Sequence, residues 1–273
     1  MGKPKKTTED AVDVMLDGTK LASKPPKGDP LYGAISNACA RNRWRGTVEE
    51  LAGLLTKGCS FAPGVFAANT RSNESWVQQQ VFALDFDNSK EEEDLTPEDV
   101  LERCDELDIR PAFLYPSFSD TTEKRKFRAV FVADGVVNGI PLRKLVQNVL
   151  KEIFTFEQGE PDKGCHEPAR FFLGTNKPLI HADYDARINP VQLHAGARKL
   201  LQQQDRSHLA RNFERLCSRL GLAVEGSHGY GVCFCCFEED LDKRFCQLGF
   251  VGGDLGESAA TSMINSVDAP ESP

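Results

Sequence analysis

The chain has 273 residues, of which 40% are hydrophobic and 27% charged, and its formal net charge is −8 at pH 7. This length is enough for one large or two small domains with a sizeable core. No apolar run reaches the roughly 18 residues that a membrane helix needs, and the acidic balance argues against wrapping of nucleic acid along the whole chain.

The charge is unevenly distributed. Residues 88–108 carry ten acids against two bases, so the remainder is close to neutral and contains local basic clusters at 124–128 and 187–219. Such patches, not net charge, decide where a phosphate backbone docks. The charged N-terminus, Met1–Lys6, has no apolar segment behind it, so we expect a cytoplasmic protein whose nine cysteines stay reduced.

The first part of the chain is the least regular in pattern. Residues 1–30 are rich in Lys and Thr and end in a Pro-rich run, so we expect a flexible N-terminus. A helix is predicted from Val48 to about Lys57, because 47–50 is a capping box and Gly58 can end the helix. Residues 59–80 are expected to be loop and short strand.

The stretch Val81–Asn88 is the centre of the interpretation. It reads as a strand, and its alternation puts Asp85 and Asp87 on one face, opposite the apolar side chains of the other. Two carboxylates this close repel each other unless they share a cation, and Mg²⁺ or Mn²⁺ prefers such oxygen ligands. The alternative is an exposed strand end with two solvated acids.

Five further elements follow in an order that defines a fold. We predict a helix, two strands, a second helix and a last strand: Pro97–Leu107, Pro111–Ser117, Phe127–Ala133, Pro141–Phe154 and Ala169–Leu173. With the first strand this gives an α+β fold, with an RRM-like or ferredoxin-like βαββαβ core. Its first and third strands are central neighbours and one sheet face lacks helices, so Asp85, Asp87 and Arg128 would share an open face.

The domain organisation follows. We expect a flexible segment at 1–30, a catalytic domain at 31–185 with its core at about 81–175 and an N-terminal α/β lead-in, a helical C-terminal extension at 186–225, and a tail at 226–273 that is partly disordered. The tail cysteines lack paired C-x2-C spacing, so no zinc is expected: Cys233, Cys235, Cys236 and Cys246. The basic stretch 187–219 is a candidate template grip, through Arg211 and Arg215.

Four segments in order resemble the archaeo-eukaryotic primase superfamily, in particular the primase-polymerase domains of phage and plasmid replication proteins. They are the capping-box helix with Arg71-x-Asn73, the strand ending in Asp85-x-Asp87-Asn88, the pair Ser117-x-Ser119 and Lys126-x-Arg128, and the run from Asp162 through Pro168-x-Arg170 to Gly174-Thr175. The likeness covers roughly residues 45–180.

The resemblance implies template-directed nucleotidyl transfer from NTPs or dNTPs on a single-stranded DNA template, for replication of a phage, plasmid or integrated element. Asp85, Asp87 and Asp162 would be catalytic and would bind two ions of Mg²⁺ or Mn²⁺, one activating the 3′-hydroxyl and one holding the triphosphate. Six residues would bind nucleotide: Ser117, Ser119, Lys126, Arg128, His166 and Arg170.

Two features depart from the family pattern or leave it open. Many members carry a histidine in the second motif, whereas none lies between Ser117 and Phe131 here; His166 is a substitute, although a lone loop histidine is more often solvated. Asp162 is also explained by a turn, and Arg170 by pairing with Glu167. The chain contains no P-loop motif, so a separate replicative helicase is the expected partner.

Other classes of function remain open. A non-catalytic or degenerate RRM-like module would bind nucleic acid through stacked aromatic side chains. A haloacid-dehalogenase-type phosphohydrolase also uses a strand ending in D-x-D, with Asp183-x-Asp185 as its later acidic motif, but usually continues Asp-Gly-Thr. Rolling-circle nicking proteins need a His-h-His motif, and the five histidines form none.

Overall fold

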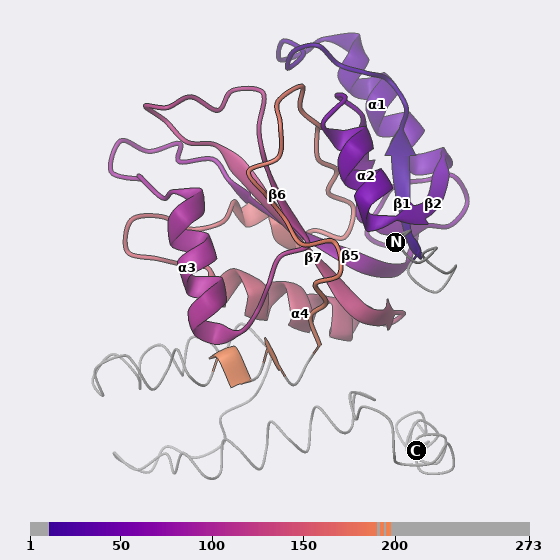
Figure 1. The fold of residues 1–273 in the computed structure, drawn as a ribbon. Helices are drawn as coiled ribbons and strands as arrows, with labels where there is room; N and C mark the ends of the chain where they lie inside the picture. Colours follow the sequence, from indigo (N-terminus) through magenta and orange to yellow (C-terminus); the bar gives the residue numbers. More distant parts are fainter. Residues whose placement is uncertain (1–10, 190–191, 194, 198–273) are drawn as a thin grey trace, which may run out of the picture. The chain divides into compact units, whose positions relative to one another are not determined.

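The computed structural model describes residues 11–189, 192, 193 and 195–197. It is an α+β fold with two antiparallel sheets, a three-stranded one in the order β2-β1-β3 and a five-stranded one in the order β4-β5-β7-β6-β8 (Figure 1). The strands are β1 (Ala11–Asp17), β2 (Arg43–Thr47), β3 (Ser60–Ala62), β4 (Gly64–Phe66), β5 (Trp76–Phe86), β6 (Phe113–Pro116), β7 (Phe127–Val137) and β8 (His181–Ala182). The helices are α1 (Pro30–Arg41), α2 (Val48–Leu55), α3 (Pro97–Leu107), α4 (Ile140–Ile153) and the 3-10 turn η2 (Lys163–His166).

Most of the predicted core is confirmed. β5, α3, β6, β7 and α4 follow one another as expected, and β5 and β7 are central neighbours. The predicted capping box at 47–50 is present, and the structure shows a second one at the start of α3. The side chains of Thr47 and Thr96 accept hydrogen bonds from the N3 amides of α2 and α3, and the Glu50 and Asp99 side chains accept hydrogen bonds from the N-cap amides in return. Local capping chemistry therefore fixes where these helices begin.

The predicted last strand, residues 169–173, is wrong. Only Phe172 pairs there, in a single bridge with Phe61 of β3, through two backbone hydrogen bonds of 2.9 and 2.8 Å. The strand that pairs with β5 on the side away from β7 is β4, which comes earlier in the chain. At the other edge of the sheet, β8 pairs with β6. A short apolar run carries no information about its partner, so periodicity alone could not distinguish the two arrangements.

The expectation of a flexible N-terminus is wrong for the part that the structure describes. β1 (Ala11–Asp17) is the central strand of the three-stranded sheet, and Val12 and Val14 are buried in it. α1 follows, with the Asp29 side chain as its N-cap. The alternation Val-Asp-Val in 12–14 is a strand signal, and the charged residues around it obscured it.

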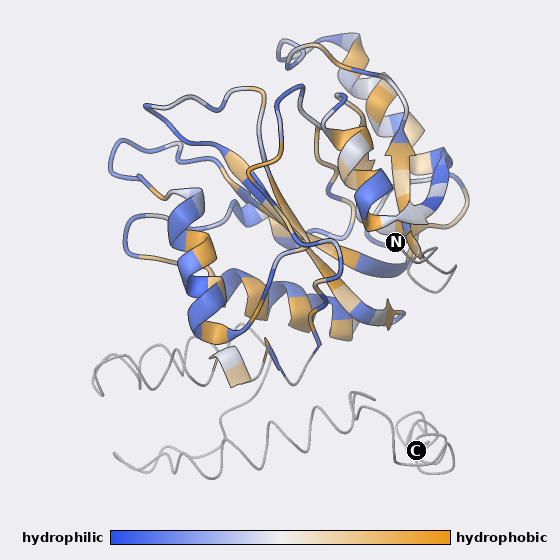
Figure 2. Cartoon of the chain, viewed as in Figure 1, coloured by the Kyte–Doolittle hydropathy of each residue, from blue (hydrophilic) through white to orange (hydrophobic). Residues whose placement is uncertain are grey.

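The expectation of an open sheet face is also wrong. α3 and α4 lie on one side of the five-stranded sheet, and β1, β2, α1 and α2 lie on the other (Figure 1). On this second side, one buried cluster packs the N-terminal elements against the sheet, and its members include Val12, Leu51, Val81 and Val130. The central strands of the five-stranded sheet are apolar over most of their length, whereas the β6–β7 loop and the outer helix faces are hydrophilic (Figure 2). The N-terminal lead-in therefore covers the face that carries Asp85.

Several predictions fall outside the described residues. These are the cysteine tail, most of the helical extension, and the candidate template grip at Arg211 and Arg215. Among the helices that the structure does describe, none combines the length and apolarity required to cross a membrane.

Candidate active site

The three predicted acids come together at one end of β5. Asp85 is the second-last residue of β5, and Asp87 directly follows the strand. Asp162 is brought beside them because its backbone N–H donates a hydrogen bond of 2.8 Å to the Asp85 carbonyl. Segments separated by more than seventy residues are therefore joined here, and Asp162 lies beside Asp85.

Each carboxylate is paired with a cation from the chain itself. Lys126 Nζ lies 3.0 Å from Asp87 Oδ1, and Arg128 Nε lies 3.0 Å from Asp85 Oδ1. Arg170 Nη2 contacts two acids, Asp162 Oδ2 at 3.0 Å and Asp85 Oδ2 at 3.5 Å. Three acids and three bases therefore balance, which removes the repulsion that the carboxylates would otherwise suffer.

These pairs differ in their exposure to solvent. The Asp85 and Arg128 side chains are each 11% exposed, whereas Arg170 is 34% and Asp87 51% exposed. Burial alone would lower the pKa of Arg128, but Asp85 and the neighbouring Tyr115 raise it above its ordinary value. Arg128 also donates a hydrogen bond of 2.9 Å to the Leu173 carbonyl. This inner pair is fixed, and the outer side chains are accessible to a ligand.

The β6–β7 loop positions Lys126, and its organiser is an acid that sequence reasoning missed. The Asp120 carboxylate accepts hydrogen bonds from the Lys126 backbone N–H (2.7 Å) and from Arg125 Nε (3.0 Å). Ser117 is buried and Ser119 exposed, and their hydroxyls lie 3.2 Å apart in the same loop. These contacts span five and six residues, so Asp120 closes the loop onto the start of β7, and the Ser-Asp-Thr-Thr composition, which is typical of loops, was the available signal.

Asn88 ties the acidic strand to that loop. Its side-chain nitrogen donates hydrogen bonds to the carbonyls of Leu95 (2.7 Å) and Arg125 (2.8 Å), and its oxygen accepts one from the Leu95 amide (3.2 Å). The residue is 5% exposed and has a left-handed backbone with φ of 40°. Asn adopts this conformation more readily than most residues, so both the backbone and the hydrogen bonds explain why an Asn follows the D-x-D motif.

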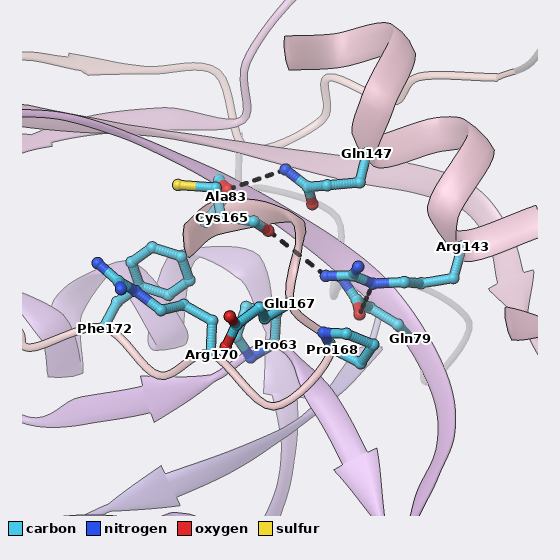
Figure 3. Close-up of a pocket in the computed structure, with 10 residues that line it drawn as sticks. All are labelled: Pro63, Gln79, Ala83, Arg143, Gln147, Cys165, Glu167, Pro168, Arg170 and Phe172. Atoms are coloured by element: carbon cyan, nitrogen blue, oxygen red, sulfur yellow. Dashed lines mark hydrogen bonds between the residues drawn. The ribbon is translucent and has the colours of Figure 1, made fainter. Parts of the chain in front are cut away.

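Buried polar side chains of α4 and β5 hold the segment that contains Cys165 (Figure 3). Arg143 of α4 donates hydrogen bonds to the carbonyls of Cys165 and His166 and to Gln79 Oε1 (3.3 Å), while Gln147 donates to the Ala83 carbonyl (3.3 Å). Burial lowers the pKa of Arg143 to about 10. The small pocket between these groups is also lined by Glu167, Pro168 and Arg170.

Cys165 lies next to Asp85. The Asp85 amide donates a hydrogen bond of 3.2 Å to its sulfur, and burial, reinforced by the Asp85 charge, raises the pKa of the thiol to about 12. The thiol is therefore protonated and packs as a small apolar group. His166 is exposed instead, and its ring lies against the Lys163 carbonyl of its own turn. The described contacts do not join that ring to the three carboxylates.

The donor chemistry of the site fits a divalent metal. Among the described residues, no group of three His, Cys, Asp or Glu side chains is arranged to hold an ion. However, Asp85 Oδ2 and Asp162 Oδ2, from different segments, meet at one positively charged nitrogen of Arg170. Carboxylate oxygens that share one cation are the ligands that Mg²⁺ and Mn²⁺ prefer.

Comparisons with known proteins add one structural likeness. No protein-family model matches the chain, and no curated protein matches its sequence. Among solved structures, the fold resembles the AEP domain (PP-N190) of the cyanophage S-2L primase-polymerase, PrimPol. The match covers 69% of this chain and 89% of that chain, at 14% identity and a TM-score of 0.38.

Proposed function

We propose that this protein is a primase-polymerase, a nucleotidyltransferase that extends a nucleic-acid strand on a single-stranded DNA template in the replication of a mobile element. The observation that supports the proposal is the convergence of Asp85, Asp87 and Asp162 with Lys126 and Arg170 at the end of β5. Carboxylates for metal ions beside cations for phosphates are the groups that phosphoryl transfer requires.

The residues then divide the work. Asp85, Asp87 and Asp162 would hold Mg²⁺ or Mn²⁺, which when bound would acidify the 3′-hydroxyl and stabilise the leaving pyrophosphate. Lys126 and Arg170 are partly exposed and would contact phosphate oxygens, with Ser119 as a hydrogen-bond donor at the loop surface. Arg128 is buried against Asp85, so its role in this proposal is to orient that carboxylate.

The other function classes receive less support from the geometry. A binding-only RRM-like module needs exposed aromatic side chains on its sheet, but Phe113 and Tyr115 are fully buried, and the exposed large apolar side chains among the described residues are Val77 and Val136. A phosphohydrolase of the haloacid-dehalogenase type usually continues its acidic strand with Asp-Gly-Thr. Here Asp87-Asn88-Ser89 stands at that place, and Asn88 is committed to hydrogen bonds with Leu95 and Arg125.

A primer-synthesis assay tests the proposal. The full chain is incubated with single-stranded templates, labelled NTPs or dNTPs and Mn²⁺ or Mg²⁺, beside Asp87→Asn. Asp87 is half exposed, so its change leaves the fold intact and should lower product formation by about 100-fold, the scale of a lost transition-state contact. The double change Glu91→Gln/Glu92→Gln removes exposed charges from the following loop and should leave activity unchanged.

The outcomes separate the classes. Metal-dependent oligomers that are lost in Asp87→Asn and kept in the control support polymerase activity, and the nucleotide that is incorporated defines the sugar preference. Template binding without product, from folded protein on several templates, would favour a binding module. Phosphate release from a generic phosphomonoester that depends on Asp85 would favour the phosphohydrolase.

A further inference from the structure

We propose that the Arg170 guanidinium is an internal competitor of the metal, which occupies the cation position between Asp85 and Asp162 until a nucleotide draws it away. The inference rests on the proposed function, because it concerns the same carboxylates. It goes further by predicting that metal and nucleotide bind cooperatively, and that the free protein binds metal more weakly than its three acids would allow.

The contacts of Arg170 carry the first step. A single nitrogen, Nη2, lies 3.0 Å from Asp162 Oδ2 and 3.5 Å from Asp85 Oδ2. A divalent ion between these oxygens and the guanidinium cannot hold the same place, since two cations would then be in direct contact. The other Asp85 oxygen is held by Arg128 and the other Asp162 oxygen by the Gly164 amide. The oxygens available to a metal are therefore the ones that Arg170 covers.

The Arg170 side chain is free to leave, whereas its backbone is not. It is 34% exposed, so it can turn into solvent on the fast timescale of exposed rotamers. The preceding residue is held at both ends: the Ala169 amide donates to Asn73 Oδ1 (3.2 Å), and Arg71 donates to the Ala169 carbonyl and to Ser36 Oγ (2.6 Å). The Arg71-x-Asn73 segment thus fixes the point from which the guanidinium swings.

Gly164 provides the space in which the guanidinium lies. A Cβ at this position would be 2.6 Å from Arg170 Nη1, the end of a flexible side chain, and 3.3 Å from Asp162 Oδ1. The Gly164 amide would still be able to donate to Asp162. Gly164→Ala should therefore push Arg170 off the carboxylates without removing its charge, which gives a second and independent way to open the site.

The charge of a nucleotide supplies the reason for exchange. A triphosphate offers Arg170 bidentate, charge-assisted hydrogen bonds, which replace those it gives up to Asp85 and Asp162. Each ligand then makes the other bind more tightly, by the same factor. The arrangement keeps the acids neutralised in the free protein and exposes them to metal only when substrate is present.

Manganese binding without nucleotide tests the inference separately from catalysis. Free Mn²⁺ is followed by its electron paramagnetic resonance signal during titration of the full chain. Arg170→Met and Gly164→Ala should each bind Mn²⁺ about tenfold more tightly than the unchanged protein, within the usual range of coupled sites. Asp162→Asn should weaken binding. Arg110→Met removes a cation from an exposed pair with Asp105 and serves as the charge control, with no change expected.

Addition of a non-hydrolysable triphosphate completes the test. It should tighten Mn²⁺ binding to the unchanged protein and have much less effect in Arg170→Met. Mn²⁺ affinity in Arg170→Met and Gly164→Ala equal to or weaker than that of the unchanged protein, with Asp162→Asn still impaired, would overturn the competition and leave the proposed function standing. Binding that is the same in all variants, including Asp162→Asn, would show that no metal site exists and would overturn both.

Discussion

Asn88 gives the most direct test of how the site is held together. Asn88→Ala removes three hydrogen bonds that join β5 to the segment before α3 and to the β6–β7 loop. Each is worth about 1 kcal/mol net, and the partners Leu95 and Arg125 are left without them in a largely buried region. A left-handed Ala costs about 1 kcal/mol more, so we expect the free energy of unfolding to fall by about 4 kcal/mol.

A matched control separates the two contributions. Asn69 is also left-handed, with φ of 55°, but it is exposed, and no side-chain hydrogen bond is found for it among the described contacts. Asn69→Ala should therefore cost only the backbone term of about 1 kcal/mol. Urea unfolding of the two variants and the unchanged protein gives both values. A difference between the variants below about 1 kcal/mol would refute the bridging role of Asn88.

Three further outcomes are expected. Arg128→Met leaves Asp85 Oδ1 buried without its cation, while Arg170 still lies 3.5 Å from Oδ2, so unfolding in urea should show a loss of about 3 kcal/mol, of which Arg128→Lys recovers part. Gly58→Ala places a Cβ 2.2 Å from the Leu21 carbonyl oxygen at a φ of 90°. The free energy of unfolding should fall by at least about 2 kcal/mol, which a lower melting temperature would report. Burial raises the pKa of Cys39 and Cys165 from 9.0 to about 12 in the folded protein, so between these pH values the unfolded chain binds fewer protons than the folded one. Stability should therefore decline as the pH rises above 9, by up to about 1.4 kcal/mol per pH unit for each thiol, and a Cys→Ala variant should show a shallower decline.

The sequence determined the elements whose signals are local. The capping box at 47–50 predicted the start of α2, because a helix start depends on groups three residues apart. The N-cap position of Thr96 and the apolar stripe of 97–107 predicted α3. Strand alternation likewise predicted that Asp85 and Arg128 lie on one face, and they are direct register partners in the β5–β7 pair. Both inferences need only the geometry of one element or of one pair.

Tertiary structure decided everything that depends on distant partners. The structure places β4, not residues 169–173, beside β5, and it covers the sheet with β1 and α2. Both results depend on which apolar surfaces bury one another, and a short apolar run does not encode its partner. The same holds for the site. Sequence order suggested three acids, but only the fold shows that Arg170 lies between two of them, because a guanidinium on a long side chain pairs with whichever carboxylates packing brings within its reach.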